Sequence, residues 1–494
     1  MEHPLQVDEL TQTDNPPAVV VEPAPAPAPP PFAAAGATPL PPLPNLPSSD
    51  VLFLKPSDAQ YKTYLPAANL RTRLSPALRA VCKTEHAVSV MVDWVRSNRL
   101  SFAVRCGGHS YEGFSQSTDV VIDLRGLAAI NVDTSAGLVT VGSGAALFGI
   151  YQAIAAKGFG LQAGSCPTVG VSGHILGGGH GLLARSHGLT CDSMQQVKLV
   201  DSQARVLTAS AASEPDLYWA CKGGGGGSFG VATEFKLHIF PLKTALVFGV
   251  SWKLSQAQAA KLFAAWQAWA PNAPSNVTSI MKVGSAGGGA ITMRCIGQSV
   301  GSESELRAQL KPLVTLEPVS SALSVQSLSF INAVKHFAGP LDYEQVYMKA
   351  KSDYVLNPLG ANAIGVMMQT LAPLPAGAVV LLCDGYGGKI TDVAATDTAF
   401  PRRAGTQYCI QYYSSWTSAS ATASHVANVA KVYAAMRPFM PGASYVNYCD
   451  LDLKNYPFAY WGDNLPRLMD VKAQYDPDNV FRHAQSVPLP GATA

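Results

Sequence analysis

The sequence predicts an α+β protein, with a glycine-rich region of mixed helices and strands followed by a second domain whose antiparallel sheet is covered by helices. Two observations support this fold class. Helical and strand-like segments alternate between glycine-lined loops up to about residue 241, whereas from residue 242 strand-like segments with fewer glycine clusters alternate with amphipathic helices. A chain of 494 residues with 48% hydrophobic residues is also long enough for two or three domains.

The elements follow one another in a regular order. Residues 84–98 carry apolar side chains at helical spacing, and residues 100–105 indicate a strand that enters a glycine-rich turn. In the rest of the first region we expect strands at 119–127, 137–144 and 195–210, helices at 145–158 and 216–222, and a glycine-rich stretch at 164–188. In the second region we expect strands at 246–255, 290–299, 378–388 and 407–416, and a helix at 422–437.

The composition is typical of an enzyme that acts on a small molecule. Only 14% of the residues are charged and the formal net charge is +2, without a run of five like charges, so neither nucleic acid nor a membrane surface is indicated as a partner. The nine cysteines are odd in number and dispersed, which fits reduced thiols better than a disulfide framework.

The N-terminal region predicts a tail. Residues 15–48 are dominated by Pro and Ala, which favours extended, solvated chain, and we expect residues 1–50 to be disordered. Residues 1–14 carry acidic side chains where a signal peptide needs basic residues and an apolar run. Since no apolar stretch of about 18 residues occurs either, we expect a cytoplasmic protein, with an atypical export route left open.

Three glycine clusters, at 107–108, 177–179 and 223–227, indicate close approach of the backbone to a ligand. Glycine tolerates positive φ and leaves backbone N–H groups bare, which suits an anionic pyrophosphate, although each cluster alone is also compatible with an ordinary tight turn. The sequence GSGAALFG at 142–149 comes nearest to a dinucleotide fingerprint, but its third glycine is misplaced. A dinucleotide would therefore be held by a fold other than the Rossmann fold.

Five motifs in this order resemble the berberine bridge enzyme-like branch of the vanillyl-alcohol oxidase and p-cresol methylhydroxylase superfamily of flavoproteins. They are VRCGGHSYEG (104–113), GSCPTVGVSGHILGGGHG (164–181), DLYWACKGGGGGSFGVATEF (216–235), YVNYCDLD (445–452) and KAQYDPDNVFRHAQSV (472–487). The resemblance implies a two-lobed FAD-binding domain of the p-cresol methylhydroxylase type over residues 51–241. It also implies a substrate-binding domain over 242–444, and a return of 445–494 to the FAD-binding domain.

The resemblance further implies that FAD is bound through two covalent bonds. His109 occupies the position of the histidine that links to the flavin 8α-methyl group, and Cys166 that of the cysteine bonded to ring carbon 6. Two tethers would raise the flavin reduction potential and allow an open cleft for a bulky substrate. Other cofactor contacts implied by the resemblance are Arg105, Cys106, Gly107, Gly108, Ser110, Val169, Gly170, Gly173, His174, Gly178, Gly230, Val231 and Asn447.

Oxidation of a C–OH group by hydride transfer needs a base for the hydroxyl proton. Tyr448 stands where the resemblance places the tyrosine base of alcohol-oxidising members, and its use as a base requires a group that stabilises the phenolate. Tyr111 and Gln411 are expected beside it. At the substrate face we expect Cys409, His180 and Tyr386.

The sequence departs from plant monolignol-oxidising relatives at the expected active site. Cys409 and His180 stand where those relatives have a lysine and a tyrosine, which weakens the case for their substrates and their mode of base activation. The FPHR sequence common in the family reads FPRR at 400–403, and the added cation has no assigned role. Val169 occupies a position where a small aliphatic side chain admits oxygen to the reduced flavin in relatives, which predicts an oxidase that produces hydrogen peroxide.

The resulting prediction is an FAD-dependent oxidase that converts an alcohol to a carbonyl, at the anomeric carbon of an oligosaccharide or on a secondary metabolite. One alternative is oxidative cyclisation or C–C bond formation on an alkaloid-like substrate, but the carboxylate expected near 407–413 is absent. Another is a flavin-binding protein without catalysis, which the presence of Tyr448 disfavours. No metal is expected, because His174, His180 and His187 match no common ligand spacing. We expect a monomer or a weak homodimer.

Overall fold

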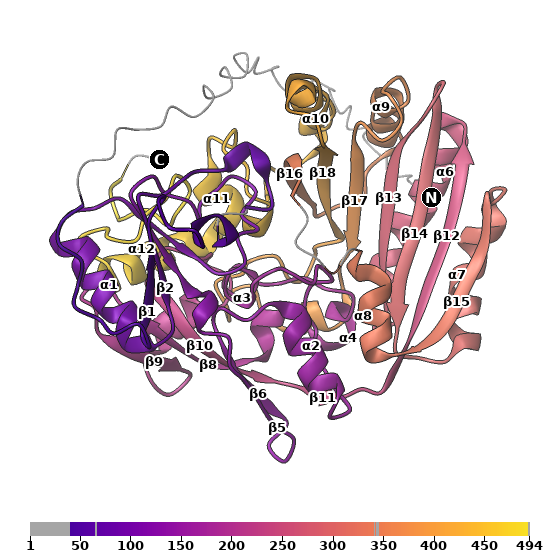
Figure 1. Ribbon diagram of the computed structural model, residues 1–494. Helices are drawn as coiled ribbons and strands as arrows, with labels where there is room; N and C mark the ends of the chain where they lie inside the picture. Colours follow the sequence, from indigo (N-terminus) through magenta and orange to yellow (C-terminus); the bar gives the residue numbers. More distant parts are fainter. Residues whose placement is uncertain (1–39, 65–66, 340, 342–344, 493–494) are drawn as a thin grey trace, which may run out of the picture. The chain divides into compact units, whose positions relative to one another are not determined.

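The computed structural model describes residues 40–64, 67–339, 341 and 345–492 (Figure 1). Residues 1–39 of the predicted tail lie outside the described residues. For residues 40–50 the prediction of disorder is corrected, because this segment packs on the protein. Leu40, Leu43 and Leu46 contact a hydrophobic core, and the Trp94 indole donates a 2.9 Å hydrogen bond to the Pro42 carbonyl. A Pro-rich segment has three residues per turn, so leucines at this spacing share one side.

The first sheet carries the loop that contains His109. It has four strands in the order β1 (Val51–Leu54), β2 (Leu78–Cys82), β4 (Val120–Asp123) and β3 (Phe102–Arg105), and β4 is parallel to both β2 and β3. Helix α1 (Glu85–Ser97) connects β2 to β3, and its N-cap Thr84 accepts a 3.2 Å hydrogen bond from the Ala87 amide. Since β3 ends at Arg105, the GGHS motif follows directly at its carboxyl end.

The second sheet has five strands in the order β5 (Ile130–Asp133), β6 (Leu138–Gly142), β10 (Val231–His238), β8 (Met194–Val200) and β9 (Val206–Ser210). All neighbours in this sheet are antiparallel. Around it lie α2 (Leu147–Ala155), α3 (Val171–Leu176), α4 (Ala184–His187), α5 (Pro215–Ala220) and the short pair β7 (Phe159–Gly160) and β11 (Phe240–Pro241).

The single strand predicted over residues 195–210 is wrong, because β8 and β9 form a hairpin. The Asp201 carboxylate accepts hydrogen bonds from the amides of Gln203 and Arg205 at 2.9 and 2.8 Å, which closes the turn. Ala204 has a positive φ of 62° in that turn. An aspartate that binds the backbone two residues later is a typical turn signal.

The third sheet has seven strands, all antiparallel to their neighbours. Their order is β15 (Ser321–Ser329), β12 (Thr244–Leu254), β14 (Ala290–Ser299), β13 (Val277–Gly287), β17 (Val380–Gly385), β18 (Tyr408–Trp416) and β16 (Tyr347–Val355), as Figure 1 shows. Helices α6 (Gln256–Trp269), α9 (Ala361–Leu371) and α10 (Thr422–Met436) pack on one face, and α7 (Glu303–Leu316) and α8 (Phe330–Ala338) complete this region. Helix α8 packs against the other face at β12.

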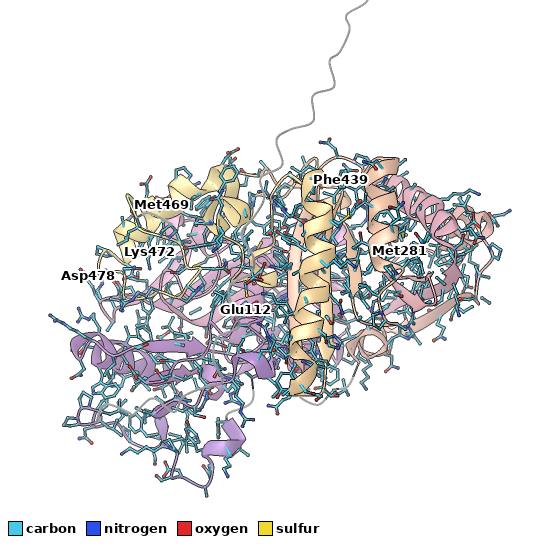
Figure 2. All side chains as sticks on the ribbon, turned by 90° about the horizontal axis from the view of Figure 1, so that it is seen from above. Glu112, Met281, Phe439, Met469, Lys472 and Asp478 are labelled. Atoms are coloured by element: carbon cyan, nitrogen blue, oxygen red, sulfur yellow. The ribbon has the colours of Figure 1, made fainter. Side chains whose placement is uncertain are left out.

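The C-terminal residues pack with the second sheet. Helices α11 (Tyr456–Trp461) and α12 (Leu465–Tyr475) share a hydrophobic core with β8 and β10. Lys472 of α12, labelled in Figure 2, is fully buried and donates to the Asp476 carboxylate and to the carbonyls of Ser228 and Phe481 at 2.6–2.7 Å. Among the described residues, no helix is long and apolar enough to cross a membrane.

Candidate active site

One cavity of about 550 Å³ lies where the three sheets and the C-terminal segment meet. The glycine-rich loops form one side of it, through residues of 106–115, 164–182 and 224–230. The seven-stranded sheet forms another side with residues from β13, β17 and β18, and the segment 445–449 lies between them. Segments far apart in the sequence therefore line one space of the size that a large ligand needs.

Two glycines bring the His109 and Cys166 loops together. A side chain on Gly107 would overlap the backbone of Gly170, and one on Gly170 would overlap the Cys106 thiol. Cys106 in turn contacts the Ser143 carbonyl at 2.8 Å. Only glycine permits this close backbone approach, so the pair explains why both loops carry glycine next to the predicted attachment residues.

His109 lies where these two loops meet, and its imidazole ring is neutral. Its Nε2 lies 2.9 Å from Thr168 Oγ1, and burial together with the charge of Arg105 lowers the pKa of His109 to about 4. A neutral ring keeps the lone pair that a nucleophile needs. Cys166 lines the same cavity and is the one exposed thiol among the nine cysteines, all of which lie within the described residues.

Several features of the cavity fit a flavin dinucleotide. No atom lies within 4 Å of the place where a Cβ on Gly173 would stand, so this wall is open to a flat ring. The Ser115 hydroxyl is buried at the cavity and has no hydrogen-bond partner among the described residues. Asn447 lines the cavity as well and donates 3.1 Å hydrogen bonds to the His174 carbonyl and the Tyr445 hydroxyl.

A stack of two tyrosines stands at the sheet side of the cavity. The rings of Tyr111 and Tyr448 are parallel within 3°, with centroids 5.9 Å apart. Gln411 of β18 donates a 2.8 Å hydrogen bond to the Tyr111 hydroxyl. All three side chains line the cavity, so the structure brings the predicted catalytic residues together.

Asp384 is a candidate functional residue that sequence reasoning missed. It lies on β17, is 5% exposed, and accepts a 3.3 Å hydrogen bond from the Tyr448 hydroxyl. Burial raises the pKa of Asp384 to about 7, and the hydrogen bond from Tyr448 and the charge of Lys282 oppose this rise only in part. The available signal was an aspartate in an otherwise apolar strand, VLLCDG.

The surroundings of Tyr448 bear on its predicted role as the base. Burial raises the pKa of Tyr448 well above its ordinary value, and the neighbouring Asp384 carboxylate and Tyr111 raise it further. The phenol therefore keeps its proton near neutral pH. In this pair the carboxyl group, with a pKa near neutrality, is the better proton acceptor.

His180 is a predicted substrate contact that lies at the cavity. Its ring stacks on Tyr386, with centroids 5.1 Å apart and an interplanar angle of 8°. Burial lowers the pKa of His180 to about 4. Its buried Nε2 has no hydrogen-bond partner within the part of the chain that the structure describes, so a ligand hydroxyl in the cavity could satisfy it.

The structure places five predicted site residues outside the cavity wall. Tyr386 is buried behind His180, with its hydroxyl 3.2 Å from that of Tyr354, and Cys409 is paired with Asp384 across β17 and β18. These are corrections to the predicted substrate contacts. The other three are Arg105, Gly178 and Val231. Arg105 lies at the end of β3 and affects the cavity through its charge on His109.

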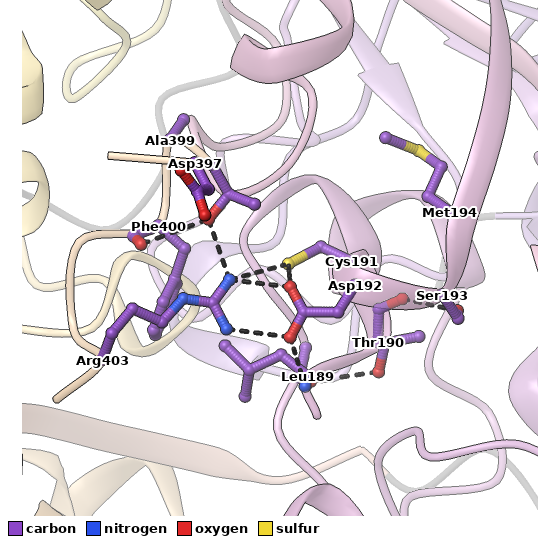
Figure 3. Close-up of polar contacts among 12 residues, drawn as sticks. Leu189, Thr190, Cys191, Asp192, Ser193, Met194, Asp397, Ala399, Phe400 and Arg403 are labelled. Carbon is purple, nitrogen blue, oxygen red and sulfur yellow. Dashed lines mark hydrogen bonds and ion pairs between the residues drawn. The ribbon is translucent and has the colours of Figure 1, made fainter. Parts of the chain in front are cut away.

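Arg403 of the FPRR segment has a packing role (Figure 3), whereas Arg402, the added cation, donates a 3.5 Å hydrogen bond to the Ala459 carbonyl. Arg403 is fully buried and donates two 2.8 Å hydrogen bonds to the Asp192 carboxylate and one to the Thr398 hydroxyl. The pair fixes the neighbouring Phe400 against Gly178, where a side chain on the glycine would overlap the ring. Arg403 thus supports the glycine-rich turn behind the cavity.

A buried ion network joins the Tyr111 and Tyr448 segments to the edge strand β16. Lys349 contacts Glu112 at 2.7 Å and Asp450 at 2.6 Å, and Lys351 contacts Asp450 and Asp452, each at 2.7 Å. Glu112, labelled in Figure 2, directly follows Tyr111, and Asp450 lies two residues after Tyr448. The network therefore ties the two stacked rings to the sheet.

Two family matches cover the parts of the chain that build this site. Residues 76–210 match the FAD binding domain family, and residues 444–488 match the family described as berberine and berberine like. An FAD-linked oxidoreductase of Bacillus subtilis, YgaK, is 33% identical over 436 residues, which cover 87% of this chain and 95% of that protein. Berberine bridge enzyme-like 25 of Arabidopsis thaliana is 32% identical, with 87% of this chain and 86% of that protein covered.

Solved structures agree with these matches. BBE-like 1 of Physcomitrella patens has a TM-score of 0.83 and 28% identity, with 90% of this chain and 98% of that chain covered. A chitooligosaccharide oxidase has a TM-score of 0.81 and 26% identity, with 89% of this chain and 98% of that chain covered. The fold described above is therefore that of FAD-linked oxidases with a two-domain α+β architecture.

Proposed function

Because this chain belongs to the berberine bridge enzyme-like family of FAD-linked oxidoreductases, we propose that it oxidises an alcohol to a carbonyl, with FAD covalently bound to His109 and Cys166 and with oxygen as the final acceptor. The observation that carries this proposal is the hydrogen-bonded pair of Asp384 and Tyr448, which lies in the same cavity as His109 and Cys166. FAD-dependent oxidoreductase chemistry follows from the family, and the roles of individual residues are the proposal.

The attachment residues have the properties that covalent binding needs. The His109 imidazole is neutral because burial and Arg105 lower its pKa, and the Cys166 thiol is exposed at the cavity. His109, Cys166, Gly173 and Asn447 would hold the flavin ring, while the loop that contains Gly107 and Gly108 would lie at the pyrophosphate. When bound, FAD would supply a hydride acceptor for the substrate C–H bond, and oxygen as the final acceptor would take up two electrons and two protons to give hydrogen peroxide.

The proton of the substrate hydroxyl goes to Asp384 through Tyr448. The Tyr448 hydroxyl accepts the substrate proton while it donates its own to Asp384 Oδ2, 3.3 Å away. Because the pKa of Asp384 is about 7, a large share of the carboxyl is ionised at neutral pH and accepts that proton. Tyr448 keeps the place that the sequence predicted for the base, but as a relay, and Tyr111 and Gln411 hold its ring in position.

The cavity wall supports the remaining steps. Val169 lies in the wall, and its small aliphatic side chain leaves room for oxygen beside the cofactor. His180 offers Nε2 to a second substrate hydroxyl, which suits an oligosaccharide or a hydroxylated secondary metabolite. Slow reoxidation of the reduced protein in air would contradict the oxidase part of the proposal.

The intact mass of the acid-denatured protein tests the covalent attachment. We expect the wild type, His109→Ala and Cys166→Ala each to retain the mass of one FAD, and the double variant to lose it. Wild-type protein without added mass would overturn both assignments. Formation of equimolar hydrogen peroxide and carbonyl product from a panel of sugars and alcohols then tests the reaction itself.

A second candidate, oxidative cyclisation, gains one supporting observation. The carboxylate that this chemistry tends to use was expected on the strand at 407–416, and Asp384 supplies one from the adjacent strand β17 instead. A product that is two mass units lighter than the substrate, with a new ring and no carbonyl, would favour this candidate. A carbonyl product would exclude it.

A further inference from the structure

The cavity face of the seven-stranded sheet carries two cations directly opposite one another. Lys282 of β13 is paired with Arg294 of β14, and on its other side Lys282 is paired with Leu382 of β17. Residues opposite one another in antiparallel strands point to the same face. Because Lys282, Leu382 and Asp384 all line the cavity, Arg294 shares the face of the reacting pair.

These two cations form no ion pair within the described part of the chain, and the carboxylate that acts on the pKa of Lys282 is Asp384, which raises it. Neither Lys282 nor Arg294 forms an ion pair or a side-chain hydrogen bond with any of the residues that the structure describes. Asp384 is the one carboxylate in the described cavity wall, and it lies in the next row of the sheet, opposite Ile280. The buried Lys349 is paired with Glu112 and Asp450, whereas Lys282 is half-buried and Arg294 is exposed.

The juxtaposition of these like charges is mildly unfavourable, because solvent screens the exposed Arg294 in part. Like charges directly opposite on a sheet destabilise it. Burial lowers the pKa of Lys282, and the charge of Arg294 lowers it further. The Arg294 guanidinium also extends over Gly249 of β12, with Nη2 4.0 Å from the position that a Cβ would take there. This glycine keeps the sheet surface beside the guanidinium clear.

We propose that Lys282 and Arg294 bind an anionic group of the substrate while its reacting hydroxyl lies at Tyr448 and Asp384. This inference rests on the proposed function and names the substrate class: a hydroxylated acid, such as a saccharide that contains a uronic acid. One row of the sheet, about 7 Å along a strand, separates Lys282 from Asp384. In a uronic acid the anomeric hydroxyl and the carboxylate are carried by the two carbons that flank the ring oxygen, so one sugar residue presents both groups to neighbouring rows of the sheet.

A matched set of sugars tests the inference. The probes are digalacturonic acid, its dimethyl ester and the neutral digalactoside, assayed by hydrogen peroxide formation with the wild-type holoenzyme. We expect kcat/KM for the acid to exceed that for the ester by about tenfold or more, which is the size of one charge-assisted hydrogen bond. A sulfated galactoside as a fourth probe distinguishes the source of the anion: preference for it over the neutral sugar assigns the site to anions in general, and its rejection assigns the site to carboxylates.

Two variants separate anion binding from a purely electrostatic effect on Asp384. In Arg294→Gln the acid-to-ester ratio should fall about tenfold, and Arg294→Lys should restore part of it. Lys253→Gln is the matched control, because Lys253 is an exposed cation on the same face of β12, one row further from Asp384. The acid-to-ester ratio of kcat/KM for Lys253→Gln should equal that of the wild type.

Different results would overturn the anion site and the proposed oxidase function. An acid-to-ester ratio near one in the wild type, or one unchanged in Arg294→Gln, overturns the anion site. If no saccharide reduces the flavin but photoreduced protein is rapidly reoxidised by oxygen, the inferred substrate class is overturned and the oxidase function stands. Photoreduced protein that stays reduced in air overturns the oxidase function itself.

Discussion

The buried carboxylates near the Tyr111–Tyr448 stack differ in their partners. Glu112 and Asp450 have side chains that are 3% exposed, and Lys349 and Lys351 contact them at 2.6–2.7 Å. Asp384 is buried to a similar degree but receives only one hydroxyl, at 3.3 Å. The first group is paired by cations and the second is not.

The pKa shifts follow this difference only in part, because burial raises the pKa of Glu112 as well, despite its contact with Lys349. Burial alone would lower the pKa of Lys349, but Asp450, Glu112 and Asp452 outweigh it and hold the pKa above its ordinary value. Burial raises the pKa of Asp384 to about 7, because the single hydroxyl and the charge of Lys282 compensate only part of the desolvation. A paired buried charge stabilises the architecture, whereas an incompletely paired one takes up and releases a proton.

Breaking the paired group should have the largest effect on stability. In Lys349→Met, Glu112 loses its ammonium partner and Asp450 keeps only Lys351, so the free energy of unfolding should fall by about 3–5 kcal/mol. Equilibrium denaturation with guanidinium measures this. A loss below about 1 kcal/mol would mean that the network is not needed to hold the Tyr111 and Tyr448 segments.

Changing the incompletely paired group should affect catalysis instead. Asp384→Asn keeps the shape and the hydrogen bond to Tyr448 but removes the proton acceptor, so kcat/KM should fall about 10²- to 10⁴-fold. Steady-state oxidation, with flavin content and circular dichroism as controls for folding, measures the effect. Activity within about tenfold of the wild type would assign the proton to another group.

The dependence of stability on pH sharpens the comparison further. The pKa of Asp384 is about 7 in the folded protein, against an ordinary value of 3.8 for an aspartate. Between these values the folded state binds the proton and the unfolded state does not, so this group makes the protein less stable as the pH rises toward about 7. The Tm of Asp384→Asn minus the Tm of the wild type should therefore increase by several degrees from pH 5 to pH 8. A constant difference in Tm would contradict the raised pKa.

A surface pair gives the smallest expected effect and serves as the control for the buried network. Arg96 and Asp93 on α1 lie 2.7 Å apart, with side chains 38% and 55% exposed. Since solvent screens such a pair, Arg96→Gln should change the free energy of unfolding by less than about 0.5 kcal/mol. Denaturation under the conditions used for Lys349→Met measures it, and a loss of comparable size would show that pairing at the network is not special.

The resemblance of short motifs to a known family predicted the residues that lie on loops with special backbone requirements. His109 and Cys166 follow glycine-rich motifs, and the structure places both at one cavity because Gly107 and Gly170 meet without side chains. Tyr448, Gln411 and Tyr111 were predicted from their motifs and are found together there. The α+β fold class was likewise predictable, because helical and strand periodicity are properties of short segments.

The tertiary structure decided which strand residues face the cavity. Asp384 was missed, and Tyr386 and Cys409 were overestimated, because a period of two identifies two faces of a strand without saying which one holds the ligand or how deep each row lies. The pairing of β17 with both β13 and β18 brings Asp384 to Tyr448 from 64 positions away and sets Lys282 opposite Arg294. The sequence alone determined the cofactor loops through backbone sterics, whereas the protonation of Asp384 depends on burial and partners that exist only after the sheet has formed.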